Sequence, residues 1–305
     1  MGVNIKLAEN CGFCFGVRRA VDTVYELRKK TDKKICIVGE LIHNNVFIKR
    51  MEADGIYCIS EEEATKIENP SDTILVIRTH GVTKQTEEKL RATGCEIVDA
   101  TCPFVKRIHR IVDENSKDSE FTVIVGDRNH PEVIGIESYA NGDAVICSDD
   151  IECSNVVNKL RQEKVEKVLL VSQTTGNNEK YVNCQKNVKK VYTNAKIFDT
   201  ICNVTENRQN EVKELATNAN LMCVIGCTKS SNTRKLYDIA SAYCKNVYLL
   251  ETADELDENQ LKELYGKWVE SSDGTDDFTV GITAGASTPD DIIEEVKVRI
   301  EKILF

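Results

Sequence analysis

VDATC occupies residues Val98–Cys102 and FDTIC occupies Phe198–Cys202, so an Asp-x-x-Cys pattern occurs twice, each time behind an apolar run typical of a β-strand. A third copy of the surrounding pattern is centred on Cys14. Each of these cysteines is followed by a strand-like run that ends in a glycine, at offsets of 25, 24 and 24 residues: Gly39, Gly126 and Gly226. A polar landmark then follows at offsets of 29, 28 and 28 residues: His43, His130 and Ser230. Such agreement predicts an internal repeat with a period of roughly 100 residues.

The segment behind each cysteine predicts a helix, because apolar side chains keep a helical period in residues 16–30 and again in 104–112. Strand-like and helical runs then alternate, which predicts parallel sheets with right-handed crossovers. The third copy is one strand short, and the N-terminal NIKLAE can supply the missing strand. We therefore expect an α/β fold of three pseudo-threefold-related lobes, each a small, mostly parallel sheet with flanking helices, around a central iron–sulfur cluster. The lobes are residues 14–100, 101–199 and 200–305, the last completed by the N-terminal strand in 1–13.

The cluster prediction rests on the placement of Cys14, Cys102 and Cys202 beyond the carboxyl ends of strands, where ligands gather in open α/β sheets. Three lobes about one axis would bring the thiolates to one point. Three thiolates can bind a catalytic zinc, or they can leave one iron of a 4Fe-4S cluster without a protein ligand. Zinc ligands usually include a closely spaced pair, whereas these are 88 and 100 residues apart, which favours the cluster. The Asp of each Asp-x-x-Cys is expected to stabilise its turn through the side chain.

The other cysteines are expected to pack in the core. The chain has 13 cysteines, and an odd count in a thiol-rich chain fits a disulfide framework poorly. Five lie in or beside apolar runs: Cys36, Cys58, Cys147, Cys223 and Cys244. Cys11 forms a CxxC with Cys14, but no second CxxC exists to complete a zinc site, so we assign Cys11 to packing as well.

Charge and hydropathy exclude several partners. The formal net charge of −10 argues against a nucleic acid or an anionic membrane surface as the main partner. The N-terminus lacks a charged-then-apolar signal segment, and no stretch approaches 18 apolar residues, so we expect a cytoplasmic protein.

Several strings resemble one family, the 4-hydroxy-3-methylbut-2-enyl diphosphate reductases, which are the last enzymes of the non-mevalonate isoprenoid pathway. They run in family order over nearly the whole chain: GFCFGVRRAV around Cys14, ELIHNN around His43, THGV around His80, DATCP around Cys102, HPEVIG around His130, QTTG around Thr174, ICNVTENRQ around Cys202, KSSNTRKL around Ser230 and TAGASTP around Ser287. The resemblance implies a 4Fe-4S cluster on Cys14, Cys102 and Cys202, whose unique iron binds the allylic hydroxyl of the substrate. Two electrons and two protons then remove that hydroxyl as water, giving isopentenyl and dimethylallyl diphosphates. Ferredoxin or flavodoxin would supply the electrons.

The resemblance also implies roles for single residues. Glu132 is the proton source, relayed through Thr174 or the substrate. The diphosphate would be bound by donors in turns just past strands, where backbone amides can also face an anion: His43, His80, His130, Ser230, Ser231, Asn232 and Ser287. His109 lies inside a helical run and is expected to be structural. Basic residues behind the cysteines are expected to be solvated helix faces, with docking of an acidic electron donor as the alternative: Arg18, Arg19, Lys106, Arg107, Arg110 and Arg208.

Three other functions compete with this interpretation. A quinolinate-synthase-like dehydratase could share three cysteines and pseudo-threefold lobes, but it would not need HPEVIG followed by KSSNTR. A redox or iron sensor could keep the cysteines without Glu132 beside diphosphate donors. A zinc hydrolase is the third alternative, and a metal analysis would separate it from the others.

Overall fold

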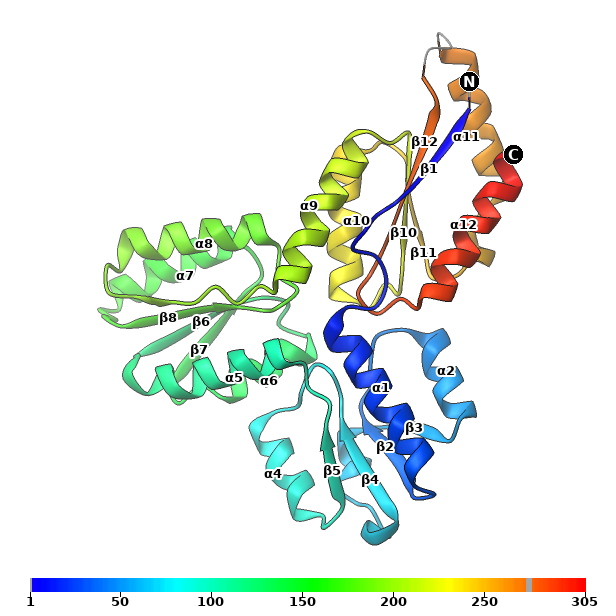
Figure 1. Ribbon diagram of the computed structural model, residues 1–305. Helices are drawn as coiled ribbons and strands as arrows, with labels where there is room; N and C mark the ends of the chain where they lie inside the picture. Colours follow the sequence, from blue (N-terminus) through cyan, green and yellow to red (C-terminus); the bar gives the residue numbers. More distant parts are fainter. Residues whose placement is uncertain (1, 273–275) are drawn as a thin grey trace. The chain divides into compact units, whose positions relative to one another are not determined.

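The computed structural model describes residues 2–272 and 276–305, and it contains three four-stranded sheets (Figure 1). The first has the order β3-β2-β4-β5, with β2 (Lys34–Val38), β3 (Ile56–Ile59), β4 (Thr73–Ile77) and β5 (Glu96–Asp99). The second has the order β7-β6-β8-β9, with β6 (Phe121–Val125), β7 (Asp143–Cys147), β8 (Val168–Ser172) and β9 (Lys196–Ile197). The third has the order β11-β10-β12-β1, with β10 (Leu221–Ile225), β11 (Val247–Leu250), β12 (Phe278–Ala284) and β1 (Val3–Leu7).

All strand pairs within these sheets are parallel, and the strand order is the same in each sheet when strands are counted from the start of each repeat. The N-terminal strand β1 pairs with β12 and takes the edge position that β5 and β9 hold in the other sheets. The predicted α/β fold class with three lobes is confirmed.

Helices connect the strands as the parallel order requires, since a parallel connection must cross back over the sheet. Their bounds are α1 (Phe15–Lys30), α2 (Asn45–Ala53), α3 (Glu61–Ala64), α4 (Lys84–Ala92), α5 (Pro103–Asn115), α6 (Pro131–Ser138), α7 (Asp150–Gln162), α8 (Asn178–Val191), α9 (Asn203–Thr217), α10 (Ser231–Tyr243), α11 (Glu258–Ser271) and α12 (Asp290–Leu304). Short 3-10 turns are η1 (Pro70–Asp72), η2 (Ser116–Asp118) and η3 (Ala253–Glu255). No helix in the described ranges is both long and apolar enough to cross a bilayer.

The chain divides into two compact units. The first unit comprises Met1–Phe15, His43–Phe47 and Asn203–Phe305, and it contains the third sheet. The second unit comprises Gly16–Ile42 and Ile48–Cys202, and it contains the first and second sheets.

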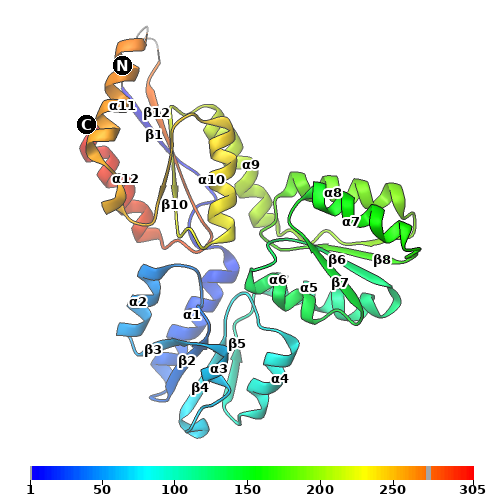
Figure 2. The same ribbon diagram turned by 180° about the vertical axis from the view of Figure 1, so that it is seen from behind.

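Central strands are buried along nearly their whole length because helices cover both faces of the sheets. In the second sheet, α7 and α8 pack on one face and α5 and α6 on the other (Figure 1). In the third sheet, α11 and α12 cover one face, and α9 and α10 cover the other, as can be followed from behind in Figure 2. Burial on both faces explains why the strand sequences are continuous apolar runs rather than alternating ones.

One backbone hydrogen bond recurs in each sheet and shows the repeat at the level of geometry. The glycine after the first strand of each repeat donates its N–H to the carbonyl of the last residue of the next strand, and the pairs are Gly39 to Ile59 (2.7 Å), Gly126 to Cys147 (2.8 Å) and Gly226 to Leu250 (2.8 Å). The same loop geometry therefore leads from each first strand to the polar landmark beyond it.

The core cysteines follow the sequence prediction with one difference. Cys36, Cys147, Cys223 and Cys244 are buried, whereas Cys58 on the edge strand β3 is only half-buried. Burial raises the pKa of Cys223 to about 12, so this side chain remains a protonated thiol at neutral pH and acts as a small apolar group.

Close packing at Gly285, just after β12, gives a testable prediction for stability. A Cβ added there would overlap Oγ1 of Thr233, an atom close to the α10 backbone that cannot swing away. We expect Gly285→Ala to lower the free energy of unfolding by roughly 1–3 kcal/mol, the usual cost of overpacking. The measurement is urea denaturation followed by circular dichroism.

Gly266 in α11 provides the matched control, because nothing lies within 4 Å of a Cβ added there. Gly266→Ala should raise the free energy of unfolding by up to about 1 kcal/mol, since alanine favours a helix interior. Equal stability of the two variants would contradict the packing argument.

Candidate functional site

The three predicted ligand cysteines occupy equivalent positions. Cys102 is the N-cap residue of α5, and Cys14 and Cys202 directly precede α1 and α9. Each donates its backbone N–H to the carbonyl of the residue two places beyond the third strand of another repeat, and the pairs are Cys14 to Ala286 (3.2 Å), Cys102 to Thr79 (2.9 Å) and Cys202 to Thr174 (3.1 Å). The fold thus holds the start of each helix against the carboxyl end of a central strand.

The chemistry of these donors fits an iron–sulfur cluster. All three are half-buried and none is in a disulfide, whereas eight of the other ten cysteines are fully buried. A thiol at a helix N-terminus faces the positive end of the helix dipole, which stabilises the thiolate form that binds iron. Thiolates are also the ligands that iron–sulfur clusters require. Cys14 belongs to the first unit, and Cys102 and Cys202 belong to the second.

Asp99 stabilises the turn before Cys102, as the sequence analysis predicts. Its Oδ1 accepts a hydrogen bond of 2.9 Å from the backbone N–H of Thr101, and its Oδ2 lies 2.5 Å from Nζ of Lys106. Arg19 on α1 donates from Nη2 to the carbonyl of Thr101 at 2.6 Å. These three contacts hold the turn that precedes Cys102.

A buried polar cluster in the second unit contains Glu132, Thr174, His130 and His80. The Glu132 side chain is 1% exposed, and its two oxygens accept hydrogen bonds from the backbone N–H (2.6 Å) and the hydroxyl (2.9 Å) of Thr174. The rings of His80 and His130 make an edge-to-face contact with centroids 5.1 Å apart. The structure therefore brings together four of the predicted site residues, with Thr174 bonded to the Glu132 carboxyl group, His130 bonded to the Glu132 backbone and His80 against the His130 ring.

His130 is the N-cap residue of α6, and this fixes how its ring can act. Its Nδ1 accepts a hydrogen bond of 3.1 Å from the backbone N–H of Glu132. A nitrogen that accepts carries no proton, so in this arrangement the ring proton lies on Nε2. In this arrangement the His130 ring is neutral and can donate a hydrogen bond from Nε2, although an anionic ligand would by itself favour a charged ring.

The first unit contains a second polar cluster, at the N-terminus of α10. Ser230, Ser231 and Asn232 are buried there, with Oγ of Ser230 accepting from the N–H of Thr233 at 3.3 Å. The amide nitrogen Nδ2 of Asn232 is buried and has no hydrogen-bond partner among the described residues. Unpaired buried donors are rare in native proteins, and one at a helix N-terminus is suited to an anionic ligand.

Ser287 and His43 are also close together in the first unit. The hydroxyl of Ser287 donates to the backbone carbonyl of His43 at 3.1 Å. Ser287 follows β12, and His43 belongs to the short segment His43–Phe47 that is separated in sequence from the rest of this unit.

The expectation for Arg208 is wrong. The sequence analysis places it on a solvated helix face or at a docking surface, but it is 3% exposed. Its guanidinium donates from Nη1 to the carbonyl of Ala284 (2.8 Å) and from Nη2 to that of Gly12 (2.6 Å). These two carbonyls satisfy the buried guanidinium. Through its bond to Gly12, Arg208 holds the loop that carries Cys11 and Cys14. A basic residue at a helical position gives no sequence signal that separates this role from an exposed one.

Cys11 packs against the core of the first unit. Burial raises its pKa to about 12, although the nearby charge of Arg208 acts in the opposite direction. Cys11 is therefore a protonated thiol at neutral pH and acts as a small apolar group.

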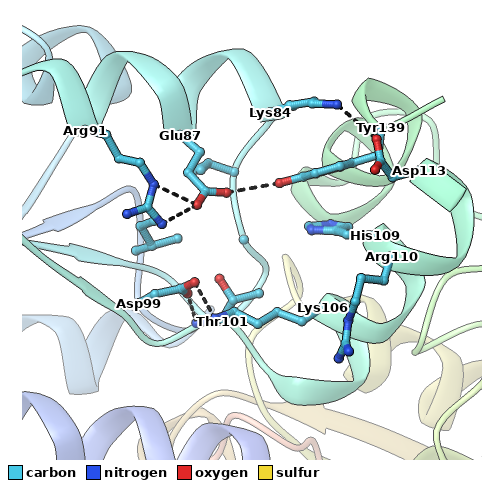
Figure 3. Close-up of a pocket in the computed structure, with 13 residues that line it drawn as sticks. Lys84, Glu87, Arg91, Asp99, Thr101, Lys106, His109, Arg110, Asp113 and Tyr139 are labelled. Atoms are coloured by element: carbon cyan, nitrogen blue, oxygen red, sulfur yellow. Dashed lines mark hydrogen bonds and ion pairs between the residues drawn. The ribbon is translucent and has the colours of Figure 1, made fainter. Parts of the chain in front are cut away.

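His109 is buried in α5, and its ring stacks on Tyr139 with centroids 4.3 Å apart (Figure 3). Two glycines make room for it. A Cβ at Gly81 would lie 3.0 Å from Cε1 of His109, and one at Gly135 would lie 3.3 Å from Nε2. Burial lowers the pKa of His109 to about 4, so the ring is neutral at neutral pH.

The lowered pKa predicts a pH dependence of stability. The unfolded state takes up a proton on His109 near pH 6.5, whereas the folded state does so only near pH 4, so stability is lost as the pH falls between these values. Between pH 7.5 and pH 5 the wild type should lose roughly 2 kcal/mol more than His109→Gln, which cannot be protonated. Urea denaturation at both pH values measures this difference, and identical pH dependence of the two proteins would contradict a buried neutral His109.

The fold defines a three-lobed α/β protein with three thiols in equivalent places, each at the start of a helix. Comparison with known families is more specific. The model of the LytB protein family matches residues 5–301, and the chain belongs to this family.

Relatives and solved structures agree with this assignment. The chain is 41% identical over 302 residues to a 4-hydroxy-3-methylbut-2-enyl diphosphate reductase of Caldanaerobacter subterraneus subsp. tengcongensis, covering 99% of this chain and 96% of that protein. It is 38% identical to the enzyme of that name from Aquifex aeolicus, covering 99% and 97%. It is similar to the structure of the E-1-hydroxy-2-methyl-but-2-enyl-4-diphosphate reductase from Plasmodium falciparum, with a TM-score of 0.84, 27% identity, and coverage of 98% of this chain and 88% of that one. A structure of (E)-4-hydroxy-3-methyl-but-2-enyl diphosphate reductase aligns over 99% of this chain and 100% of that one, with a TM-score of 0.66 and 37% identity.

Proposed function

We propose that this chain is a 4-hydroxy-3-methylbut-2-enyl diphosphate reductase, the oxidoreductase that catalyses the last step of the non-mevalonate isoprenoid pathway. The reaction breaks the allylic C–O bond and releases the hydroxyl as water. It consumes two electrons and two protons, one proton for the water and one for the product carbon, and gives isopentenyl or dimethylallyl diphosphate. The observation that carries the proposal is the buried carboxyl of Glu132, held by Thr174 beside the His80–His130 pair, in a chain that belongs to the LytB family over nearly its whole length.

The proposed cofactor is one [4Fe-4S] cluster ligated by Cys14, Cys102 and Cys202, with one iron that lacks a protein ligand. Support comes from the equivalent placement of these thiols at helix N-termini, each held by the same backbone hydrogen bond. When bound, such a cluster supplies one-electron transfer and a Lewis-acidic iron for the hydroxyl group. Zinc is less well supported, because the three candidate ligands include no closely spaced pair once Cys11 is assigned to the core.

Glu132 is the proposed proton source, with Thr174 as the relay. A carboxyl group buried to 99% is well placed to carry a proton, and the Thr174 hydroxyl at 2.9 Å can pass it on by reversing its hydrogen bond. The backbone N–H of Thr174 fixes the other oxygen at 2.6 Å, so the carboxyl cannot rotate away from the hydroxyl. Orientation by two bonds is what positioned general-acid catalysis requires.

The diphosphate is the proposed ligand of the polar clusters in the two units. In the second unit the donors are His80 and Nε2 of His130. In the first unit they are His43, Ser230, Ser231, Asn232 and Ser287, of which Asn232 has a buried amide nitrogen without a partner among the described residues. Helices α6 and α10 begin in these clusters, so their N-terminal amides favour the negative charge.

We further propose the lobe boundaries 14–100, 101–199 and 200–305, with residues 1–13 completing the last lobe. Ferredoxin or flavodoxin is the proposed electron donor, and the cytoplasm is the proposed location. Lys106, Arg107 and Arg110 are exposed cations on α5, just behind Cys102, where an acidic donor protein could dock on an otherwise acidic chain.

Glu132→Gln tests the proton source. It keeps the size of the side chain and an acceptor for Thr174, but it cannot supply the proton. We expect the iron–sulfur absorption spectrum to remain and turnover to fall by roughly two orders of magnitude or more, the scale of lost general-acid catalysis. Glu137→Gln, an exposed glutamate on the same helix, is the control and should retain wild-type turnover. Near-wild-type turnover of Glu132→Gln would remove this residue from the mechanism.

Cys102→Ser tests the ligand set. A serine hydroxyl is a poor ligand for iron–sulfur clusters, so cluster content and activity should be lost together. Cys58→Ser, at another half-buried cysteine, should keep both. Iron and sulfide analysis, together with turnover of each reconstituted protein, measures the outcome. A Cys102→Ser protein with a full cluster would show that another group is the ligand.

The deciding experiment for the function is anaerobic. The chain is reconstituted with iron and sulfide, 4-hydroxy-3-methylbut-2-enyl diphosphate is added, and oxidation of a reduced viologen dye is followed. We expect substrate-dependent oxidation with isopentenyl and dimethylallyl diphosphates as products. No oxidation by a protein with an intact cluster would overturn the proposal and favour a sensor or a dehydratase, and a zinc-only metal content would favour a hydrolase.

A further inference from the structure

A cavity lies in the second unit, lined by residues of α4 and α5 and by Tyr139 just after α6, with a volume of about 420 Å³ (Figure 3). This volume is within the range of small-molecule binding sites. None of the residues assigned to the cluster, the proton source or the diphosphate lines it. The cavity adjoins the candidate site, because Asp99 and Thr101 of the turn before Cys102 also line it.

The charges around this cavity leave a positive surplus. Each lining carboxylate is already paired, and the pairs are Lys84 with Asp113 (2.9 Å), Arg91 with Glu87 (2.6 Å) and Lys106 with Asp99 (2.5 Å). Arg110 also lines the cavity, is exposed, and has no ion pair within the described ranges. Because the acids are matched by other cations, a cationic ligand would find no unpaired carboxylate here, whereas an anion would find Arg110.

The inner wall of the cavity carries an unsatisfied polar atom. His109 lines it, is 7% exposed, and has an Nε2 with no hydrogen-bond partner among the described residues. One face of its ring is covered by Tyr139. In the view of Figure 3, Arg110 lies on the other side of the ring from Tyr139, while Lys106 extends toward Asp99, and His109 and Arg110 both line the cavity.

We infer that this cavity binds a small organic anion, with a single phosphate or carboxylate group at Arg110 and a planar body against the ring of His109. Arginine and lysine are the side chains that bind such oxyanions best, and a flat apolar body packs well on an aromatic face. The volume exceeds what an inorganic ion needs, which is why an organic body belongs to the ligand. The inference does not rest on the proposed catalytic function.

Calorimetric titration of the full chain tests this inference with three probes: phenyl phosphate, benzoate and inorganic phosphate. We expect phenyl phosphate or benzoate to bind, and the tighter of the two identifies the anionic group. Arg110→Ala should weaken that binding about tenfold, the scale of one lost charge-assisted hydrogen bond. Arg107→Ala removes a neighbouring exposed cation on α5 that does not line the cavity, and it should leave the affinity unchanged.

Each other outcome overturns part or all of the inference. No binding of either organic probe at millimolar concentration removes the site. Binding that survives Arg110→Ala places the probe elsewhere in the protein, including the proposed diphosphate donors. Inorganic phosphate that binds as tightly as phenyl phosphate removes the organic body from the ligand. In protein labelled with ¹⁵N-histidine, the His109 signal, identified through His109→Gln, should shift on binding, and an unmoved signal removes His109 from the site.

Discussion

The candidate site depends on one backbone hydrogen bond, made three times. In each repeat the N–H of a cysteine donates to a carbonyl just beyond the third strand of a sheet, to Ala286, Thr79 or Thr174. This bond sets where the following helix begins, so the thiol lies at the positive end of that helix. It uses only main-chain atoms, and the sequence around each cysteine can vary without changing its placement. Thr174 contacts both proposed parts of the site, because its carbonyl accepts from Cys202 while its hydroxyl and N–H donate to Glu132.

A second backbone feature that recurs in each repeat places different side chains at equivalent positions. After the first strand of each repeat, a glycine bonds back to the next strand, and the chain then enters a helix through a polar landmark. His130 and Ser230 are both N-cap residues at that point, and each accepts a backbone N–H of its own helix. One scaffold position thus presents an imidazole in the second unit and a hydroxyl in the first. The N-terminal amides favour an anion at both places, whichever side chain is present.

The N-terminus and one face of α5 favour opposite charge states. Cys102 is the N-cap residue, where the proposed cluster chemistry needs a thiolate, whereas His109 lies on a face where burial keeps its ring uncharged. Gly81 and Gly135 leave room for that ring, and they adjoin the segments that carry His80 and Glu132. The imidazole consequently lies between the cavity and the turns of the candidate site, although it is no part of the proposed chemistry.

The sequence by itself determined the repeat, the alternation of strands and helices, and the identity of the cysteines, because these depend on spacing and on local periodicity. The equal spacing of glycines and polar residues after Cys14, Cys102 and Cys202 predicted three repeats. The continuous apolar runs predicted parallel sheets, because a strand buried on both faces is apolar along its length. Asp99 could also be predicted, because its hydrogen bond reaches only two residues along the chain. Only the tertiary structure decided the role of Arg208, the neutral state of His109 and the cavity beside it. Each depends on partners far away in sequence, such as Gly12 and Ala284 for Arg208, and burial of a charged or polar side chain leaves no pattern in the residues next to it.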